Sequence, residues 1–152
     1  MDGFARAAAR FANSTHTRLY RSSNGRFGGR IKGMPILLIT VAGRRTGTPY
    51  TVPCVYLEDA GTWIVSGSAG GMPEEPQWFR NLRASDRATV EISGVTTAVE
   101  VRVPDGERRD AIWDQLVAAA PFFTKYQAKV DRTIPVAVLT PSSTAGAGED
   151  GS

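Results

Sequence analysis

Apolar and alternating stretches in the middle of the chain predict a mainly β domain. Residues 36–41 read Ile-Leu-Leu-Ile-Thr-Val, a nearly continuous apolar run that is typical of a strand covered on both faces. Residues 96–103 alternate instead, with valines opposite small or charged side chains, as in a strand with one solvated face. Six short strands are expected, at residues 36–41, 50–57, 63–66, 89–93, 96–103 and 134–140.

Three further segments have a helical pattern. Residues 76–82 begin at a proline, residues 105–120 place three apolar side chains on one face, and residues 122–130 form a shorter segment. One long helix inserted before the last of six strands fits an α+β, mainly β class. The architecture we expect is a small antiparallel β-barrel with peripheral helices.

The two ends of the chain differ from this middle part. Residues 4–11 place two phenylalanines and two alanines on one face of a helix that runs toward Tyr20, and a glycine-rich link follows. Packing of this helix on the barrel is the preferred interpretation, and contact with an anionic membrane surface is the alternative. The last residues are small and polar, which predicts disorder. The expected division is helix and link at 1–30, cofactor-binding barrel domain at 31–140 and tail at 141–152.

Composition narrows the class of protein. A chain of 152 residues with 41% apolar and 22% charged residues is ordinary for one soluble globular domain. No window has the roughly 18 uninterrupted apolar residues of a membrane-spanning helix, and arginines interrupt the N-terminal residues where a signal peptide would be apolar. Cys54 and His16 are the single cysteine and histidine, so neither a disulfide nor a usual zinc site is expected. We therefore expect a cytoplasmic protein without a metal.

Charge is unevenly distributed along the chain. Residues 1–45 carry nine basic and one acidic side chain, whereas the remainder carries nine basic and fourteen acidic ones. Fifteen of the eighteen basic residues are arginine, which favours bidentate recognition of phosphate or carboxylate. We expect an anionic ligand near the N-terminal third. A nucleic-acid partner is not expected, because the remainder is net acidic and lacks a strand face with interleaved aromatic and basic residues.

Two loops could hold an anion. The turn at residues 43–47, Gly-Arg-Arg-Thr-Gly, offers backbone N–H groups and two guanidinium groups, which suits a phosphate. Taken alone, it is better interpreted as a solvated hairpin turn. The loop at 66–71 is rich in glycine and serine, so a flat ligand could approach its backbone closely, and the helix expected from residue 76 offers its positive end to an anion. Together these features favour a phosphorylated cofactor, and the absence of a carboxylate pair fits a cofactor that supplies the chemistry.

Four segments in one register resemble a known family. Residues 36–49, 65–71, 76–82 and 131–135 are similar to the deazaflavin-dependent nitroreductase family of actinobacteria, and the similarity covers roughly residues 15–140. It implies a split antiparallel β-barrel like that of FMN-binding flavoproteins. It also implies an oxidoreductase that uses the reduced form of coenzyme F420.

The resemblance also implies where the cofactor binds. Four groups of cofactor-binding residues follow from it: at the cleft, Leu38, Ile39 and Thr40; around the phosphate and the start of the oligoglutamate tail, Arg44, Arg45, Thr46, Gly47, Thr48 and Pro49; beside the ring, Val65, Ser66, Gly67, Ser68 and Ala69; and closing the phosphate side, Gln77, Trp78, Phe79, Arg80 and Asn81.

The substrate pocket that the resemblance implies contains Phe122, Phe123 and Tyr126. Ala120 and Phe123 stand where relatives have tyrosines, and Ala69 stands where they commonly have a lysine. A pocket with fewer hydroxyls predicts quinones or flat enones and unsaturated lactones as substrates, rather than nitroaromatics. Hydride would pass from the reduced deazaflavin to the substrate, with a proton from solvent, Ser68 or Tyr126.

Two alternatives remain at this point. An FMN-binding flavoprotein of the same barrel would show similar phosphate-binding features, because both cofactors are phosphorylated tricycles. A non-catalytic F420 carrier would also fit the loss of tyrosines from the pocket. A homodimer is a further expectation, because family barrels often pair and exposed edge strands leave room for a partner.

Overall fold

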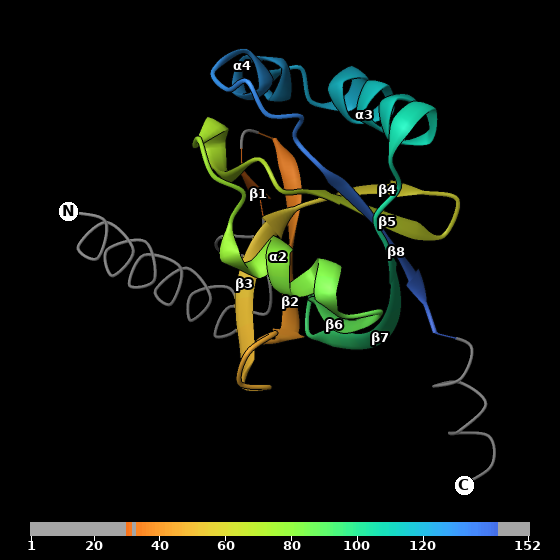
Figure 1. Cartoon of the computed structure of the whole chain (residues 1–152). Helices are drawn as coiled ribbons and strands as arrows, with labels where there is room; N and C mark the ends of the chain where they lie inside the picture. Colours follow the sequence, from red (N-terminus) through yellow and green to blue (C-terminus); the bar gives the residue numbers. More distant parts are fainter. Residues whose placement is uncertain (1–29, 32, 143–152) are drawn as a thin grey trace, which may run out of the picture.

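Residues 30–31 and 33–142 are described by the computed structural model (Figure 1). The predicted N-terminal helix, the glycine-rich link and the tail from residue 143 lie outside the described residues. Eight strands form one antiparallel sheet in the order β1-β2-β6-β7-β8-β5-β4, and β3 pairs with β2 beside this path. The strands are β1 (Arg30–Ile31), β2 (Met34–Ala42), β3 (Pro49–Val55), β4 (Leu57–Asp59), β5 (Thr62–Ser66), β6 (Arg87–Ile92), β7 (Val95–Arg102) and β8 (Val136–Pro141).

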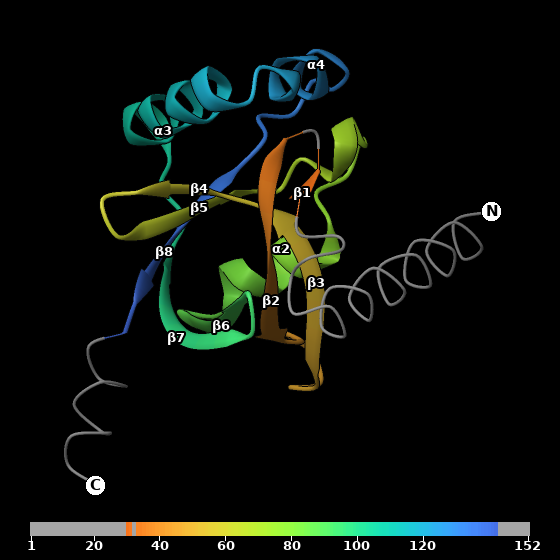
Figure 2. The same cartoon turned by 180° about the vertical axis from the view of Figure 1, so that it is seen from behind.

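The helices cover the barrel at two places. α3 (Gly106–Ala119) and α4 (Phe122–Ala128) lie together beyond one end of the sheet, while α2 (Gln77–Ala84) lies against its strands (Figures 1 and 2). A short 3-10 turn, η1 (Ala69–Gly71), follows β5 and packs on α4. The predicted mainly β barrel with peripheral helices is therefore confirmed. No helix in the described part of the chain is long and apolar enough to cross a membrane.

The number and bounds of the strands correct the prediction. The single strand expected at residues 50–57 is two strands separated by Tyr56, because β3 pairs with β2 whereas β4 pairs with β5. The last strand begins at Val136 rather than at Ile134, whose N–H donates 3.0 Å to the side chain of Gln127 instead of to a neighbouring strand. It also runs on to Pro141, which the prediction had placed in the tail. The two-residue strand β1 was not predicted, since so short a segment carries no pattern.

The barrel core is built around β2. Its residues Leu37, Ile39 and Val41 are at most 2% exposed and join the main hydrophobic cluster, while Ile36 and Leu38 on the opposite face are equally buried. The prediction that this strand is covered on both faces is thus confirmed. β2 has this position because it pairs with β3 on one side and with β6 on the other.

The two helical layers each complete a part of the core. α2 inserts Phe79 and Leu82, both 0% exposed, into the main cluster. A second cluster lies under α3 and α4 and contains Trp113, Leu116 and Phe123. Because burial of apolar surface contributes about 25 cal/mol per Å², these two contacts fix the helices on the sheet.

Candidate cofactor and active site

The turn after β2 is tied to α2 through Arg44. The Arg44 backbone N–H donates 3.1 Å to Asn81 Oδ1, and its Nη1 donates 2.7 Å to the same oxygen. Its Nη2 donates 2.8 Å to Gln77 Oε1. Gln77 and Asn81 are four residues apart on one helix, so they present their amide oxygens on the same face. The structure therefore brings together the two segments that the sequence assigned to the phosphate.

The turn is also held from within. The Gly43 N–H donates 2.7 Å to the Thr48 carbonyl, and the Gly47 N–H donates 2.8 Å to the Gly43 carbonyl. A Cβ on Gly43 would lie 2.9 Å from the ring of Tyr50, and Gly47 has a φ of +76°. Both glycines are thus required by the turn itself. Arg45, Thr46, Thr48 and Pro49 are exposed on it.

The charge of Arg44 is not neutralised by its partners. Both of its side-chain acceptors are neutral amide oxygens. Among the described residues, Arg44, Arg45 and the half-buried Arg80 form no ion pair, whereas the nearby Arg83 is bound to both oxygens of Glu75. The surface around the turn is therefore positive and suited to an anion.

In the second predicted loop, at residues 66–71, the first glycine is explained by packing rather than by turn geometry. The Gly67 N–H donates 3.0 Å to the Pro135 carbonyl, and a Cβ on Gly67 would lie 2.9 Å from ring carbons of both Phe79 and Pro135. Gly67 is therefore needed for packing between α2 and the start of β8. On the side where a side chain would lie, the space beside Gly67 is filled by protein.

Arg132 closes the loop from the other side. Its Nη2 donates to the carbonyls of Gly67, Ser68 and Met72 at 3.2, 3.3 and 3.1 Å. Burial lowers the pKa of Arg132 below its usual value; Glu75 opposes this shift and Arg80 adds to it. Two buried polar atoms of this region, Arg132 Nη1 and Ser66 Oγ, have no hydrogen-bond partner in the described part of the protein.

Aromatic residues of α4 form the predicted substrate side. Phe122 stacks on Phe123 with ring centroids 4.6 Å apart, and Tyr126 meets both rings edge-on at 5.7 and 5.6 Å. Phe123 is only 3% exposed and packs against Trp113, whereas Phe122 and Tyr126 are half-buried. α4 is also the helix on which η1 packs, so these rings lie on an element that contacts the glycine loop.

Several residues that were predicted to contact the cofactor are buried or half-buried in the structure. Leu38, Ile39 and Val65 are at most 1% exposed, and their backbones are paired within the sheet. Thr40 shares a hydrogen bond of 2.7 Å with the hydroxyl of Thr51 on β3. Phe79 is part of the core, and Trp78 is half-buried and packs edge-on against it. The apolar residues among these lie in the barrel core or pack against it.

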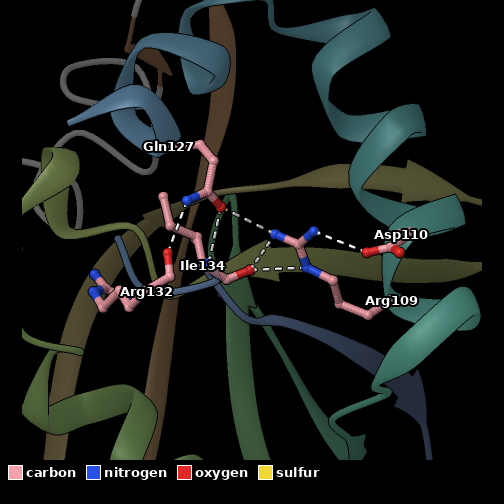
Figure 3. Close-up of polar contacts among 5 residues, drawn as sticks. All are labelled: Arg109, Asp110, Gln127, Arg132 and Ile134. Carbon is pink, nitrogen blue, oxygen red and sulfur yellow. Dashed lines mark hydrogen bonds and ion pairs between the residues drawn. The ribbon is translucent and has the colours of Figure 1, made fainter. Parts of the chain in front are cut away.

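A buried polar network was missed by the sequence interpretation (Figure 3). Arg109 of α3 is 9% exposed, lies over the Trp113 ring at 4.7 Å and donates through Nε to the Ile134 carbonyl at 3.0 Å. Gln127 of α4 accepts from the Ile134 N–H and donates 2.8 Å to the Arg132 carbonyl. The one signal in the sequence is an arginine on the same helical face as Trp113, four residues away.

An open groove of about 770 Å³ lies elsewhere, between the end of α2 and β7. It is lined by Leu82, Arg83, Ala84, Ser85, Asp86, Val101 and Val103. None of these residues belongs to the predicted site, and we assign the groove no role.

The F420H(2)-dependent quinone reductase family matches residues 12–141, which is most of the chain. The chain belongs to this family. An F420H(2)-dependent quinone reductase of Mycobacterium tuberculosis is 37% identical over 133 residues, which cover 82% of this chain and 87% of that protein.

Two solved structures are similar to this chain in fold and sequence. An F420-H2 dependent reductase, FDR-A, superposes with a TM-score of 0.63 at 33% identity, covering 69% of this chain and 93% of that chain. A structure described as a domain-swapped dimer has a TM-score of 0.64 at 32% identity, covering 74% of this chain and 84% of that chain. These comparisons confirm the split barrel.

Family membership also confirms the predicted enzyme class and cofactor, an oxidoreductase that uses reduced F420. The chain's own residues fit such a group. Within the described residues, the turn at Arg44 offers a cation without an ion pair for a phosphate, and the Ser66 hydroxyl is a buried polar atom without a hydrogen-bond partner.

Proposed function

We propose that this protein reduces quinones with F420H2, and that the turn at Arg44 binds the phosphate of the cofactor. The observation that carries the site assignment is the Arg44 guanidinium, which two neutral amides hold in place without neutralising it. An arginine that is already oriented loses less side-chain entropy when an anion binds.

The phosphate end is assigned from the donors that remain. A guanidinium has five N–H groups, and Gln77 and Asn81 occupy two of those of Arg44. The described part of the chain thus leaves three for phosphate oxygens. Arg45 and Arg80, with Thr46 and Thr48, extend the donor set toward the oligoglutamate tail. Charge-assisted bonds of this kind are about twice as strong as neutral ones.

The ring end is assigned to the loop after β5. Ser66, Ser68 and Ala69 lie between the barrel and α4, and η1 packs on α4, which carries the half-buried rings of Phe122 and Tyr126. We assign these two rings to the acceptor and Phe123 to their support. When bound, F420H2 supplies a hydride; the protein orients the acceptor, and a proton from Tyr126 Oη, Ser68 Oγ or water completes the reduction.

The acceptor is a planar quinone, with enones and unsaturated lactones second and nitroaromatics last. One hydride and one proton convert a quinone to its hydroquinone, and the cofactor leaves oxidised. The ranking rests on the aromatic group of α4, where Tyr126 is the one hydroxyl-bearing ring beside two phenylalanines. The names of relatives support a quinone as acceptor.

Two assignments concern parts of the chain beyond this site. We propose that the protein forms a homodimer, supported by the domain-swapped dimer to which it is similar and by the edge positions of β3 and β4. We also propose a barrel domain that extends from Arg30 to Pro141, with the preceding residues in contact with the barrel in the cytoplasm, or with a membrane surface. Light scattering and vesicle sedimentation test these proposals.

Fluorescence titration tests the cofactor site directly. The wild-type protein is titrated with oxidised F420 and with FMN, and we expect tight binding of F420 and weak binding of FMN. Arg44→Ala should weaken F420 binding about tenfold to hundredfold, because a hydrogen bond to a charged group contributes about 1.5–3 kcal/mol. The backbone N–H of residue 44 still reaches Asn81, so the fold should be retained.

Arg102→Ala is the matched control, because it removes an exposed arginine from β7, away from the turn. Equal F420 affinity in Arg44→Ala and Arg102→Ala would contradict the phosphate assignment. A preference for FMN would contradict the cofactor. Binding of F420 without turnover of any quinone would favour the non-catalytic carrier.

A further inference from the structure

One guanidinium binds carbonyls at both ends of the loop after β5. Arg132 Nη2 donates to the carbonyl oxygens of Gly67, Ser68 and Met72, and Arg132 Nε donates 3.3 Å to that of Met72. These residues are 60 to 65 positions away in sequence. The two ends of the loop are thus held at the same side chain.

Apart from this contact, the loop has few bonds of its own. Within η1 the Gly71 N–H donates 2.9 Å to Ser68, and the Met72 N–H donates 3.2 Å to Ala69. Ala69, Gly70 and Gly71 all have positive φ, and Ala69 at +47° is a conformation that alanine rarely adopts. Such a backbone conformation is kept only where the surrounding structure holds it in place. The hydrogen bonds from Arg132 to the loop carbonyls contribute to this.

Arg132 is itself held rigidly from the helices. Gln127 donates 2.8 Å to the Arg132 carbonyl and accepts 3.0 Å from the Ile134 N–H, and Arg109 donates to the Ile134 carbonyl (Figure 3). The backbone that follows the Arg132 side chain, from its own carbonyl to Ile134, is therefore held by side chains of α3 and α4. The arrangement also leaves Arg132 Nη1 buried without a described partner, which is unfavourable for stability.

We propose that Arg132 is a positioning residue that fixes the loop of residues 67–72 and thereby sets the rate of hydride transfer rather than the affinity for F420. The inference rests on the proposed function, because it takes this loop as the ring end of the site. Cofactor affinity is assigned to Arg44, which is tied to α2, whereas within the described residues the hydrogen bonds of Arg132 go to the loop and to Gln127 of α4. A misplacement of about 1 Å at the reacting atoms is enough to slow a reaction about a hundredfold.

Replacing Arg132 with lysine keeps the positive charge but removes the planar guanidinium. A planar fork reaches several carbonyls at once, whereas an ammonium is a point charge on a flexible stem. In Arg132→Lys we expect the amides of residues 69–72 to exchange hydrogen at least about tenfold faster, while amides of β2 and β6 are unchanged. Arg102→Lys is the matched control and should exchange as wild type.

Kinetics then test the consequence. With saturating F420H2 and a water-soluble naphthoquinone, Arg132→Lys should lower kcat by about tenfold to hundredfold, with F420 affinity within about threefold of wild type. A merely structural role would lower the melting temperature and leave kcat per folded molecule unchanged. Unchanged loop exchange, or a tenfold loss of F420 affinity at constant kcat, would overturn the proposal.

Two further outcomes are distinguishable. If the wild type binds F420 but reduces no quinone, the proposed function fails, and faster loop exchange in Arg132→Lys still supports the fixing of the loop, because that measurement needs no cofactor. If Arg132→Lys is unfolded by circular dichroism, Gln127→Ala replaces it. That variant keeps the Arg132 side chain and removes its backbone support, and wild-type loop exchange in it would count against the proposal.

Discussion

Addition of one methyl group at Gly67 tests whether this glycine serves packing rather than ligand approach. In Gly67→Ala the new Cβ would lie 2.9 Å from carbons of both Phe79 and Pro135, and both neighbours are buried. Neither ring can turn away as the end of a flexible side chain would, so the contact must be relieved by shifting α2 or the loop before β8. Overpacking of this kind typically costs about 1–3 kcal/mol.

A favourable entropy contribution reduces the expected loss of stability in Gly67→Ala. The φ of Gly67 is not in the left-handed region, so alanine loses less conformational entropy on folding there and gains about 0.4–1 kcal/mol. The net destabilisation is then about 1–2 kcal/mol. For a domain of this size it corresponds to a fall of roughly 2–8 °C in melting temperature.

The assay is thermal unfolding of the cofactor-free protein by circular dichroism, with Gly70→Ala for comparison. Gly70 has open space around its Cβ position but a φ of +64°, so that variant measures backbone strain without crowding. A Gly67→Ala protein that melts within about 1 °C of wild type, yet loses F420 affinity, would refute the packing argument. It would favour the interpretation that Gly67 admits the ligand.

Two further predictions concern charge. Asn81→Asp keeps the acceptor of both Arg44 donors but places a carboxylate beside the guanidinium. The carboxylate weakens the attraction between Arg44 and an anion by about 1–2 kcal/mol, so F420 affinity should fall about fivefold to thirtyfold. Fluorescence titration checks this, and unchanged affinity would contradict a phosphate at this position. Burial raises the pKa of the Cys54 thiol well above its usual value, so the unfolded chain loses this proton first as the pH rises. The free energy of unfolding should therefore fall by about 1 kcal/mol more between pH 9 and pH 10 than in Cys54→Val, as measured by urea unfolding; equal slopes would show that the thiol is not buried on folding.

The parts of this fold that follow a local pattern were predictable from sequence. The run around Leu37 predicted a strand buried on both faces, and the pattern of residues 76–82 predicted the helix α2. The break at Tyr56 was not predictable, because both sides of it are good strand sequence and only pairing with different partners separates them.

The candidate site divides in the same way. The turn at Arg44 is marked by its own residues, whereas the role of Arg132 depends on carbonyls more than sixty residues away, which no local spacing reports. Arg109 was missed for a related reason. Its helix is otherwise amphipathic. An arginine can lie on the apolar face because the Ile134 carbonyl, which belongs to a segment 25 residues away, accepts its hydrogen bond.

The place of β8 in the sheet has a consequence for how the chain reaches its native state. β8 is the last described strand, yet it pairs with β5 on one side and with β7 on the other. Until it emerges from the ribosome, both of those strands have an unpaired edge that could associate with other chains. Barrel closure is therefore a late event that follows synthesis of nearly the whole domain. A premature stop before Val136 should yield an aggregation-prone product rather than a smaller folded protein.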